Sequence, residues 1–252
     1  MTPPTTTLNA VLRIESSEGF TLNFKHLVFG ELCLSVVDPG VIMSMKVEEV
    51  GSPAGEEIAA LNKACQAFVE KGDLKSAFAE AEAFSKRFPV FAHAYSLQGR
   101  FAGEMGEFDT AAFHMRQSIA IRPIFSSLAE LARVLGKQGK LEDSLILSRF
   151  LLKNRKEASS DQEAMGSIQD LLVTLTRLQK GAEMVQVADA AIADYGGATV
   201  FHYQAILGLM LTKAFQPAMR RLESVEPHLN PADPMSAKFA QLKQILRGNL
   251  NA

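Results

Sequence analysis

The sequence has no tryptophan and only two cysteines, Cys33 and Cys65, among its 252 residues. Because the two cysteines form no CxxC pair, they give neither a disulfide framework nor a thiolate metal site. We expect both to be small buried residues in a reducing compartment. An excess of one charge is also missing, since 26 Lys and Arg face 28 Asp and Glu. Nucleic-acid-binding domains are usually basic, so we expect no nucleic-acid partner.

Long hydrophobic runs are absent as well. No apolar stretch approaches the roughly 18 residues that span a bilayer. The N-terminus, MTPPTTTLNAVLRIE, lacks the basic and apolar regions of a secretory signal. We therefore expect no membrane insertion and a cytoplasmic location.

Motifs for catalysis, cofactors and metals are missing too. Gly99, Gly103 and Gly106 form GxxxGxxG within and after a helical stretch, whereas the dinucleotide fingerprint is GxGxxG after a strand. No GxSxG elbow, HxxxH or HExxH occurs among the five histidines. The sequence therefore predicts no catalytic residues, no cofactor and no metal, and we expect a protein that is not an enzyme.

The first 50 residues alternate between apolar and polar residues, with a period of two over about 8–47. This period is typical of strands, and it predicts a small antiparallel β-meander of four strands. Gly30-Glu31 suits a two-residue hairpin, and Asp38-Pro39-Gly40 suits a type II turn. We expect the β region to occupy residues 1–50 and a Gly/Pro/Ser linker to occupy 51–57.

From residue 58 to the end the apolar period is helical, and the pattern repeats. GDLKSAF at 72–78, GEFDTAA at 106–112 and GKLEDSL at 139–145 line up, so their glycines are 34 and 33 residues apart. A fixed period in this range predicts a solenoid of helical pairs, which makes the protein mostly α.

The repeat resembles the tetratricopeptide repeat (TPR), a 34-residue helix–turn–helix unit. Residues 92–125 match it best, with Tyr95, Gly99, Phe108, Ala111 and Pro123 at the motif positions. The likeness is good over 58–158 and looser over 160–252. It implies an α-α superhelix of about four to five helical pairs that ends in a capping helix.

The weaker C-terminal part predicts helices over 162–179, 183–194, 199–213 and 215–226. Ser160 and Glu163 suggest a capping box for the first of these. In the last helix Asp233 is the expected N-cap, Pro234 the first residue and Gly248 the stop signal.

The resemblance also implies where a partner would bind, because TPR proteins hold peptides or helices in a concave groove lined by their first helices. Gly99 would be the small residue where two helices touch, Gly106 would occupy the turn, and Gly103 would leave room for a ligand backbone. The candidate groove residues are Asn62, Gln66, His93, Ser96, Arg100, Gly103, Arg133, Lys137 and Tyr203.

Two features of the groove stay open at this point. Arginine forks recognise carboxylates, so Arg100 and Arg133 would bind a ligand, unless they pair internally with Glu70, Glu104 or Glu130. Tyr203, Leu207 and Met210 suit an amphipathic partner helix, unless the last helix covers them.

The expected function is that of a non-enzymatic scaffold or adaptor, which binds a peptide or helix of another protein in its groove. The N-terminal β region would dock onto the repeats or a partner, or join two copies of the chain into a homo-oligomer, because open strand edges invite pairing. One alternative is a bacterial assembly or secretion chaperone that shields an apolar segment of an export, pilus or flagellar subunit. A second is an accessory arm that presents substrates to a transferase.

Overall fold

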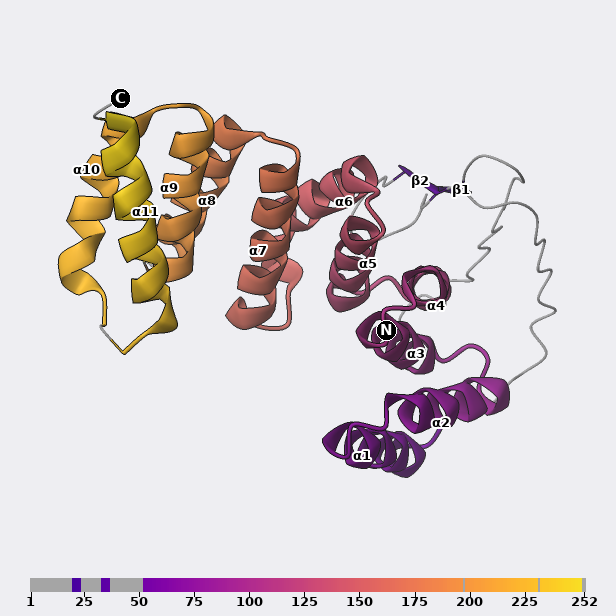
Figure 1. Ribbon diagram of the computed structural model, residues 1–252. Coiled ribbons are helices and arrows are strands. Elements are labelled where there is room, and N and C mark those ends of the chain that lie inside the picture. Colours follow the sequence, from indigo (N-terminus) through magenta and orange to yellow (C-terminus); the bar gives the residue numbers. More distant parts are fainter. Residues whose placement is uncertain (1–19, 24–32, 37–51, 197, 231, 251–252) are drawn as a thin grey trace, which may run out of the picture. The chain divides into compact units, whose positions relative to one another are not determined.

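The computed structural model describes residues 20–23, 33–36, 52–196, 198–230 and 232–250 (Figure 1). The chain divides into two compact units, Met1–Gln138 and Gly139–Ala252. We refer to them as the first and the second unit. Within the described ranges, no helix combines the length and the apolar character that crossing a membrane requires.

Two short strands are described in the N-terminal region, β1 (Phe20–Asn23) and β2 (Cys33–Val36), and they pair antiparallel. The register places Asn23 opposite Cys33, whereas a two-residue hairpin at Gly30-Glu31 would place Val28 there. The tight-hairpin register is therefore wrong for this pair. The structure describes this one strand pair of the N-terminal region. The other strands of the predicted four-stranded meander lie outside the described residues.

The described part of the first unit contains five helices, each of which packs antiparallel against the next. A core of apolar residues from α1, α2 and α3 includes Leu61, Cys65, Phe84 and Phe101. The expected alternation of helices and short turns is confirmed here. The helices are α1 (Gly55–Glu70), α2 (Leu74–Arg87), α3 (Ala92–Glu104), α4 (Phe108–Ile121) and α5 (Phe125–Lys137).

The second unit is built around α9, which contacts α7, α8, α10 and α11. Because it packs on so many sides, α9 is apolar nearly all round its circumference, as the run VFHYQAILGLML shows. The helices are α6 (Leu141–Lys153), α7 (Asp161–Arg177), α8 (Gly181–Tyr195), α9 (Thr199–Leu211), α10 (Phe215–Val225) and α11 (Pro234–Leu250). Two 3₁₀ turns, η1 (Arg155–Glu157) and η2 (Glu226–His228), follow α6 and α10.

The helix ends follow the sequence signals with two exceptions. Ser160 caps α7 as expected, since its Oγ accepts a hydrogen bond from the Glu163 amide at 3.2 Å. The Glu163 carboxylate, however, accepts from the Ser159 amide at 2.6 Å, one residue before the expected partner. Asp233 accepts from the Met235 amide at 2.8 Å and so caps α11. Gly248 does not end α11, which continues to Leu250, because its φ stays helical.

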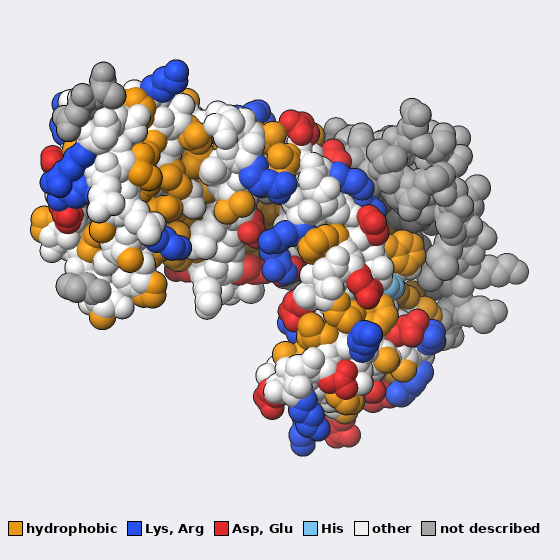
Figure 2. Space-filling view, viewed as in Figure 1, with side chains coloured by type: hydrophobic (Ala, Val, Ile, Leu, Met, Phe, Trp, Pro, Cys, Tyr) orange, Lys and Arg blue, Asp and Glu red, His pale blue; other side chains and the backbone are white. Residues whose placement is uncertain are grey.

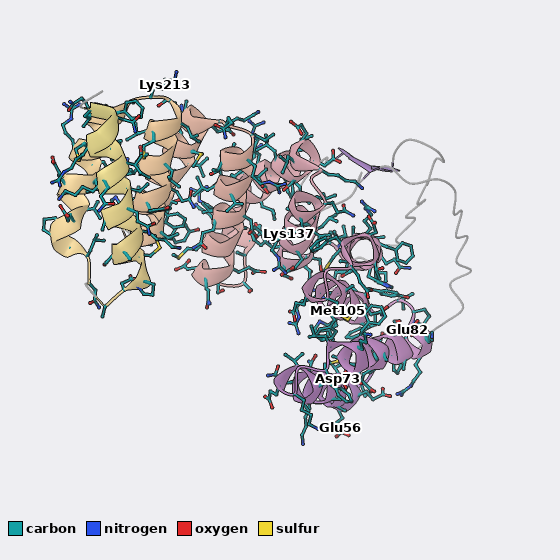
Figure 3. All side chains as sticks on the ribbon, in the orientation of Figure 1. Glu56, Asp73, Glu82, Met105, Lys137 and Lys213 are labelled. Atoms are coloured by element: carbon teal, nitrogen blue, oxygen red, sulfur yellow. The ribbon has the colours of Figure 1, made fainter. Side chains whose placement is uncertain are left out.

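The turns between paired helices share one backbone geometry. In four of them the amide after the turn residue bonds a carbonyl five residues earlier, as in Glu107 to Ala102 at 2.9 Å and Ala214 to Leu209 at 2.8 Å. Figure 3 marks three turns by the labels Asp73, Met105 and Lys213. The residue that carries the positive φ is Gly72, Gly106, Gly139, Gln179 or Lys213 in successive pairs.

These turn residues fix the repeat frame for the whole array. We number the repeats by counting each turn residue as position 15. Gln179 and Lys213 then extend this numbering into α7 and α9, where the sequence similarity to the repeat is loose. Within the described residues, α1 with α2, α3 with α4, α7 with α8 and α9 with α10 pack as helical pairs, and α11 follows them. The spacing between turns is 34, 33 and 34 residues, except for 40 between Gly139 and Gln179, where the extra residues form η1 and its flanking loop.

Gly99 confirms the expected close approach of two helices. A β-carbon at Gly99 would lie 2.8 Å from Met115 Cε and 3.1 Å from the Ala111 carbonyl oxygen. Both distances are shorter than ordinary carbon contacts, and Met115 is fully buried. Any side chain at this position would push α3 and α4 apart.

Candidate partner-binding faces

The first helices α1, α3 and α5 present a set of polar side chains, which we call the polar face. His93 Nε2 on α3 lies 2.8 Å from Asn62 Oδ1 on α1. An amide oxygen only accepts, so Nε2 carries the proton in this pair. Burial, and to a smaller degree the charge of Arg100, lowers the pKa of His93. The imidazole is therefore neutral at pH 7 and joins two neighbouring repeats.

The arginines of the polar face pair with glutamates on their own helices. Arg100 Nε lies 3.8 Å from Glu104 Oε1, and its guanidinium group stacks 5.0 Å above the Phe101 ring centroid. Arg133 donates from Nε to Glu130 Oε2 at 3.1 Å and makes a second, shorter contact to the same oxygen. Of the two open alternatives, internal pairing is thus the one present in the free chain, and it involves Glu104 and Glu130.

Such pairs are easily exchanged for a ligand. All four side chains are between about a quarter and a half exposed, and exposed pairs contribute only about 0–1 kcal/mol. The Arg100 Nε atom is buried and has no hydrogen-bond partner in the part of the chain that is described. An incoming carboxylate would therefore compete with Glu104 for the Arg100 guanidinium group.

The remaining predicted residues of the first unit lie on or beside this face. Gln66 is exposed and donates to Glu70 Oε1 at 3.0 Å, Ser96 is half-buried, and Lys137 is exposed at the end of α5. Gly103 differs from the expectation. A β-carbon there would touch Ala111 at 3.7 Å and Val134 at 3.8 Å, so the position faces α4 and α5 as well as the ligand side.

Tyr203 does not join the other predicted residues, because it lies on α9 in the second unit. Its ring packs edge-on against Phe239 of α11, with the centroids 5.7 Å apart. Leu207 and Met210 pack against the same cluster. The last helix, α11, therefore covers part of the apolar surface formed by Tyr203, Leu207 and Met210. This is the second of the two alternatives that the sequence left open.

The rest of that surface is accessible, and we call it the apolar face. It lies on α7, α9 and α11, with Val173 50% exposed on α7 and Ile245 51% exposed on α11. Figure 2 shows hydrophobic side chains gathered over α9, between α11 and α7. The sequence could have indicated Val173, which takes the position of Arg100 and Arg133, but without the turn at Gln179 the register was not defined.

The sequence also missed a polar pocket of about 410 Å³ beside the long loop before α7. Arg155 bonds Asp194 there through Nε at 2.8 Å and through Nη2 at 2.7 Å. The 40 residues between the turns at Gly139 and Gln179, against 33 or 34 elsewhere, indicate an insertion at this point of the chain. The other lining residues are Lys156, Ala158, Ser159, Ser160, Asp161 and Tyr195.

Titratable groups do not gather into a reactive site in the described part of the chain. No group of three or more His, Cys, Asp or Glu residues is placed there to hold a metal ion. Cys65 donates to the Ala77 carbonyl at 3.6 Å, and burial raises the pKa of its thiol. The thiol is therefore protonated at neutral pH and packs as an apolar group.

No protein-family model matches the sequence, and no curated protein matches it. Solved structures do. The type IV pilus biogenesis factor PilW is 13% identical with a TM-score of 0.59, over 78% of this chain and 93% of PilW. Cut9, in a complex with Hcn1, is 16% identical (TM-score 0.55, 70% of this chain). Naa15/Naa10 bound to HypK is 15% identical (TM-score 0.53, 77% of this chain).

This chain spans only 34% of the matched chain in the Cut9 structure and 29% in the Naa15/Naa10 structure. At these identities the likeness concerns the fold and not the partners. It agrees with the helical pairs, the shared turn geometry and the glycine contact of α3 with α4. The chain therefore has the α-α solenoid fold of tetratricopeptide-repeat proteins.

Proposed function

We propose that the protein is a non-enzymatic scaffold that binds a peptide of another protein on its polar face. The carrying observation is the row of side chains that crosses three successive first helices: the Asn62–His93 bond, Arg100 and Arg133. Fold neighbours with protein partners, Cut9 with Hcn1 and Naa15/Naa10 with HypK, support protein binding by this architecture.

The chemistry of the face favours a peptide with carboxylates. Arg100 and Arg133 already hold carboxylates of the same chain, and an incoming Asp, Glu or C-terminus would replace Glu104 or Glu130. We assign no catalytic step to this face, because its carboxylates are exposed and paired with arginine. Within the proposal, residues 1–50 form a β region that docks or oligomerises, 51–57 a linker and 58–252 the repeat array.

The test compares affinity purifications from the native cells, read by quantitative mass spectrometry. Arg100→Glu/Arg133→Glu should lose the bound partner, because both forks are reversed in charge. Lys75→Glu/Arg122→Glu is the matched control, since it makes the same charge change at exposed positions outside the face. Equal partner recovery by both variants would contradict the proposal, provided that circular dichroism shows both to be folded.

A second candidate function is the assembly chaperone, and the apolar face of the second unit favours it. Half-exposed Val173 and Ile245 are apolar groups that a soluble partner helix would cover. In this role the protein would shield an apolar segment of a subunit until assembly. Co-purification of a small subunit, lost on changing the apolar face alone, would distinguish it from the scaffold.

A further inference from the structure

The polar pocket of the second unit lies where the regular repeat spacing is broken. The turns at Gly139 and Gln179 are 40 residues apart, against 33 or 34 elsewhere, and the additional residues form η1 and the loop that ends at Ser160. This loop, the first residue of α7 and the last turn of α8 line the pocket. The pocket therefore depends on the insertion and not on the repeat architecture.

Polar bonds hold the walls of the pocket in place. Arg155 joins η1 to α8 through Asp194, and its Nη1 donates to the Leu152 carbonyl at 3.1 Å. The Glu163 carboxylate on α7 accepts from the Ser159 amide at 2.6 Å and from the Ser159 hydroxyl at 2.7 Å. The loop is thus bonded to both helices that face it. Its volume of about 410 Å³ is within the range of small-molecule sites, and a pre-formed site avoids the entropy cost of ordering a loop.

The pocket contains charged groups of both signs that are not committed to partners. Among the described residues, neither Lys156 nor Asp161 forms an ion pair, and both side chains are exposed. Asp194 keeps one carboxylate oxygen open, because Arg155 Nε and Nη2 both bond its Oδ2. The loop wall therefore offers one cation, and the helix ends offer two carboxylates.

Tyr195 adds a hydroxyl group beside these charges. Burial raises the pKa of its phenol, the charge of Arg155 opposes that rise, and the charges of Asp194 and Asp161 add to it. The hydroxyl is therefore protonated at neutral pH and can donate a hydrogen bond or accept one. Because both carboxylates act on this hydroxyl, Asp161 and Asp194 lie near the same point of the pocket.

We propose that this pocket binds a free α-amino acid, a small molecule that carries one ammonium and one carboxylate group. Asp161, the open oxygen of Asp194 and the Tyr195 hydroxyl bind the ammonium group, and Lys156 binds the carboxylate. An anion alone would meet the two aspartates, and a cation alone would leave Lys156 unpaired. Only a ligand with both charges matches the whole lining, since like charges brought together weaken binding.

The experiment uses the full chain and a mixture of the standard L-amino acids in saturation-transfer-difference NMR, followed by titration of the strongest responder. We expect saturable binding. The N-acetyl derivative and the amide of that amino acid should each bind at least about fivefold more weakly, because each lacks one of the two charged groups. The first resembles a peptide C-terminus and the second a peptide N-terminus, so the comparison separates a free amino acid from a chain end.

Two variants assign the charges within the pocket. Lys156→Gln should weaken binding of the amino acid about fivefold and leave binding of its amide unchanged, because the amide has no carboxylate for Lys156 to bind. Asp161→Asn should weaken binding of the amino acid and leave binding of the N-acetyl derivative unchanged. Lys153→Gln and Glu157→Gln are the matched controls, since they make the same charge changes at exposed residues that do not line the pocket, and both should bind like the wild type.

Three results overturn the proposal. They are the absence of saturable binding by any amino acid, equal affinity of Lys156→Gln and the wild type, and inorganic phosphate that competes with the amino acid and binds as tightly. The last result would assign the pocket to an anion. Because every lining residue lies in the second unit, none of these results bears on partner binding by the polar face, and Lys156→Gln should recover the partner protein like the wild type.

Discussion

Two glycine-to-alanine substitutions in the second unit should have opposite effects on stability. Gly208 lies on α9 where it crosses α8, and a β-carbon there would sit 2.8 Å from the Gly181 carbonyl oxygen, 2.9 Å from Val185 Cγ2 and 3.0 Å from Met184 Cβ. Gly166 lies on α7, and a β-carbon there would meet nothing within 4 Å. The chemical change is identical, so only the packing distinguishes the two.

The magnitudes follow from these distances. At Gly208 the new methyl group forces the backbones of α8 and α9 apart by several tenths of an ångström, and such overpacking costs about 1–3 kcal/mol. The higher helix propensity of alanine offsets about 1 kcal/mol of this cost. Gly208→Ala should therefore lower the free energy of unfolding by up to about 2 kcal/mol. Gly166→Ala should raise it by about 0.5–1 kcal/mol, because only the propensity gain remains.

Urea unfolding followed by circular dichroism measures the difference. Both helices belong to the second unit, so both variants report on the same part of the array. The midpoint should fall for Gly208→Ala and rise for Gly166→Ala relative to the wild type. Equal midpoints, or a Gly208→Ala protein at least as stable as the wild type, would refute the close contact of α8 with α9.

Two more predictions concern the turns and one ion pair. Gln179→Gly and Lys213→Gly should each raise the unfolding free energy by about 0.5–1 kcal/mol, because both native residues have a positive φ, whereas Gly106→Ala should lower it by about 1 kcal/mol. Thermal unfolding of the three variants checks these signs. Arg149 donates to Glu183 through Nε and Nη2, both at 2.7 Å, and these bonds lower the pKa of Glu183. A carboxyl with a lowered folded pKa stabilises above its unfolded pKa, and this is lost as the pH falls through the folded pKa. Glu183→Gln should therefore cost about 0.5–1 kcal/mol at pH 7 and nothing near pH 3, as urea midpoints at both pH values would show.

Local signals predicted most of the helical fold. The turn glycines and the cap residues Ser160 and Asp233 each act within a few residues, so the local sequence contains the cause. Gly99 acts across the contact of α3 with α4, and it was predictable because the repeat motif places a small residue there. Gly248 shows the limit of such signals, since a glycine ends a helix only where the chain takes a positive φ, and α11 continues past it.

The candidate site was less predictable because it depends on tertiary contacts. Whether Arg100 and Arg133 are paired depends on rotamers, and whether Tyr203 is covered depends on where α11 docks. The repeat register of α7 is defined by the positive φ of Gln179. Glutamine rarely adopts a left-handed conformation, so the sequence does not indicate a turn there. Val173 could be placed on the binding side only after that.

The central claim is that the protein works by binding another protein on the side formed by its first helices. Site-specific photo-crosslinking in native cells tests it most directly, with a benzophenone amino acid at Ser96 or Ala129 beside the polar face. The controls are exposed Ala79 and Ala83 on α2. We expect one shared cross-linked partner from the first two positions and none from the controls. Cross-links from the α2 positions alone would contradict it.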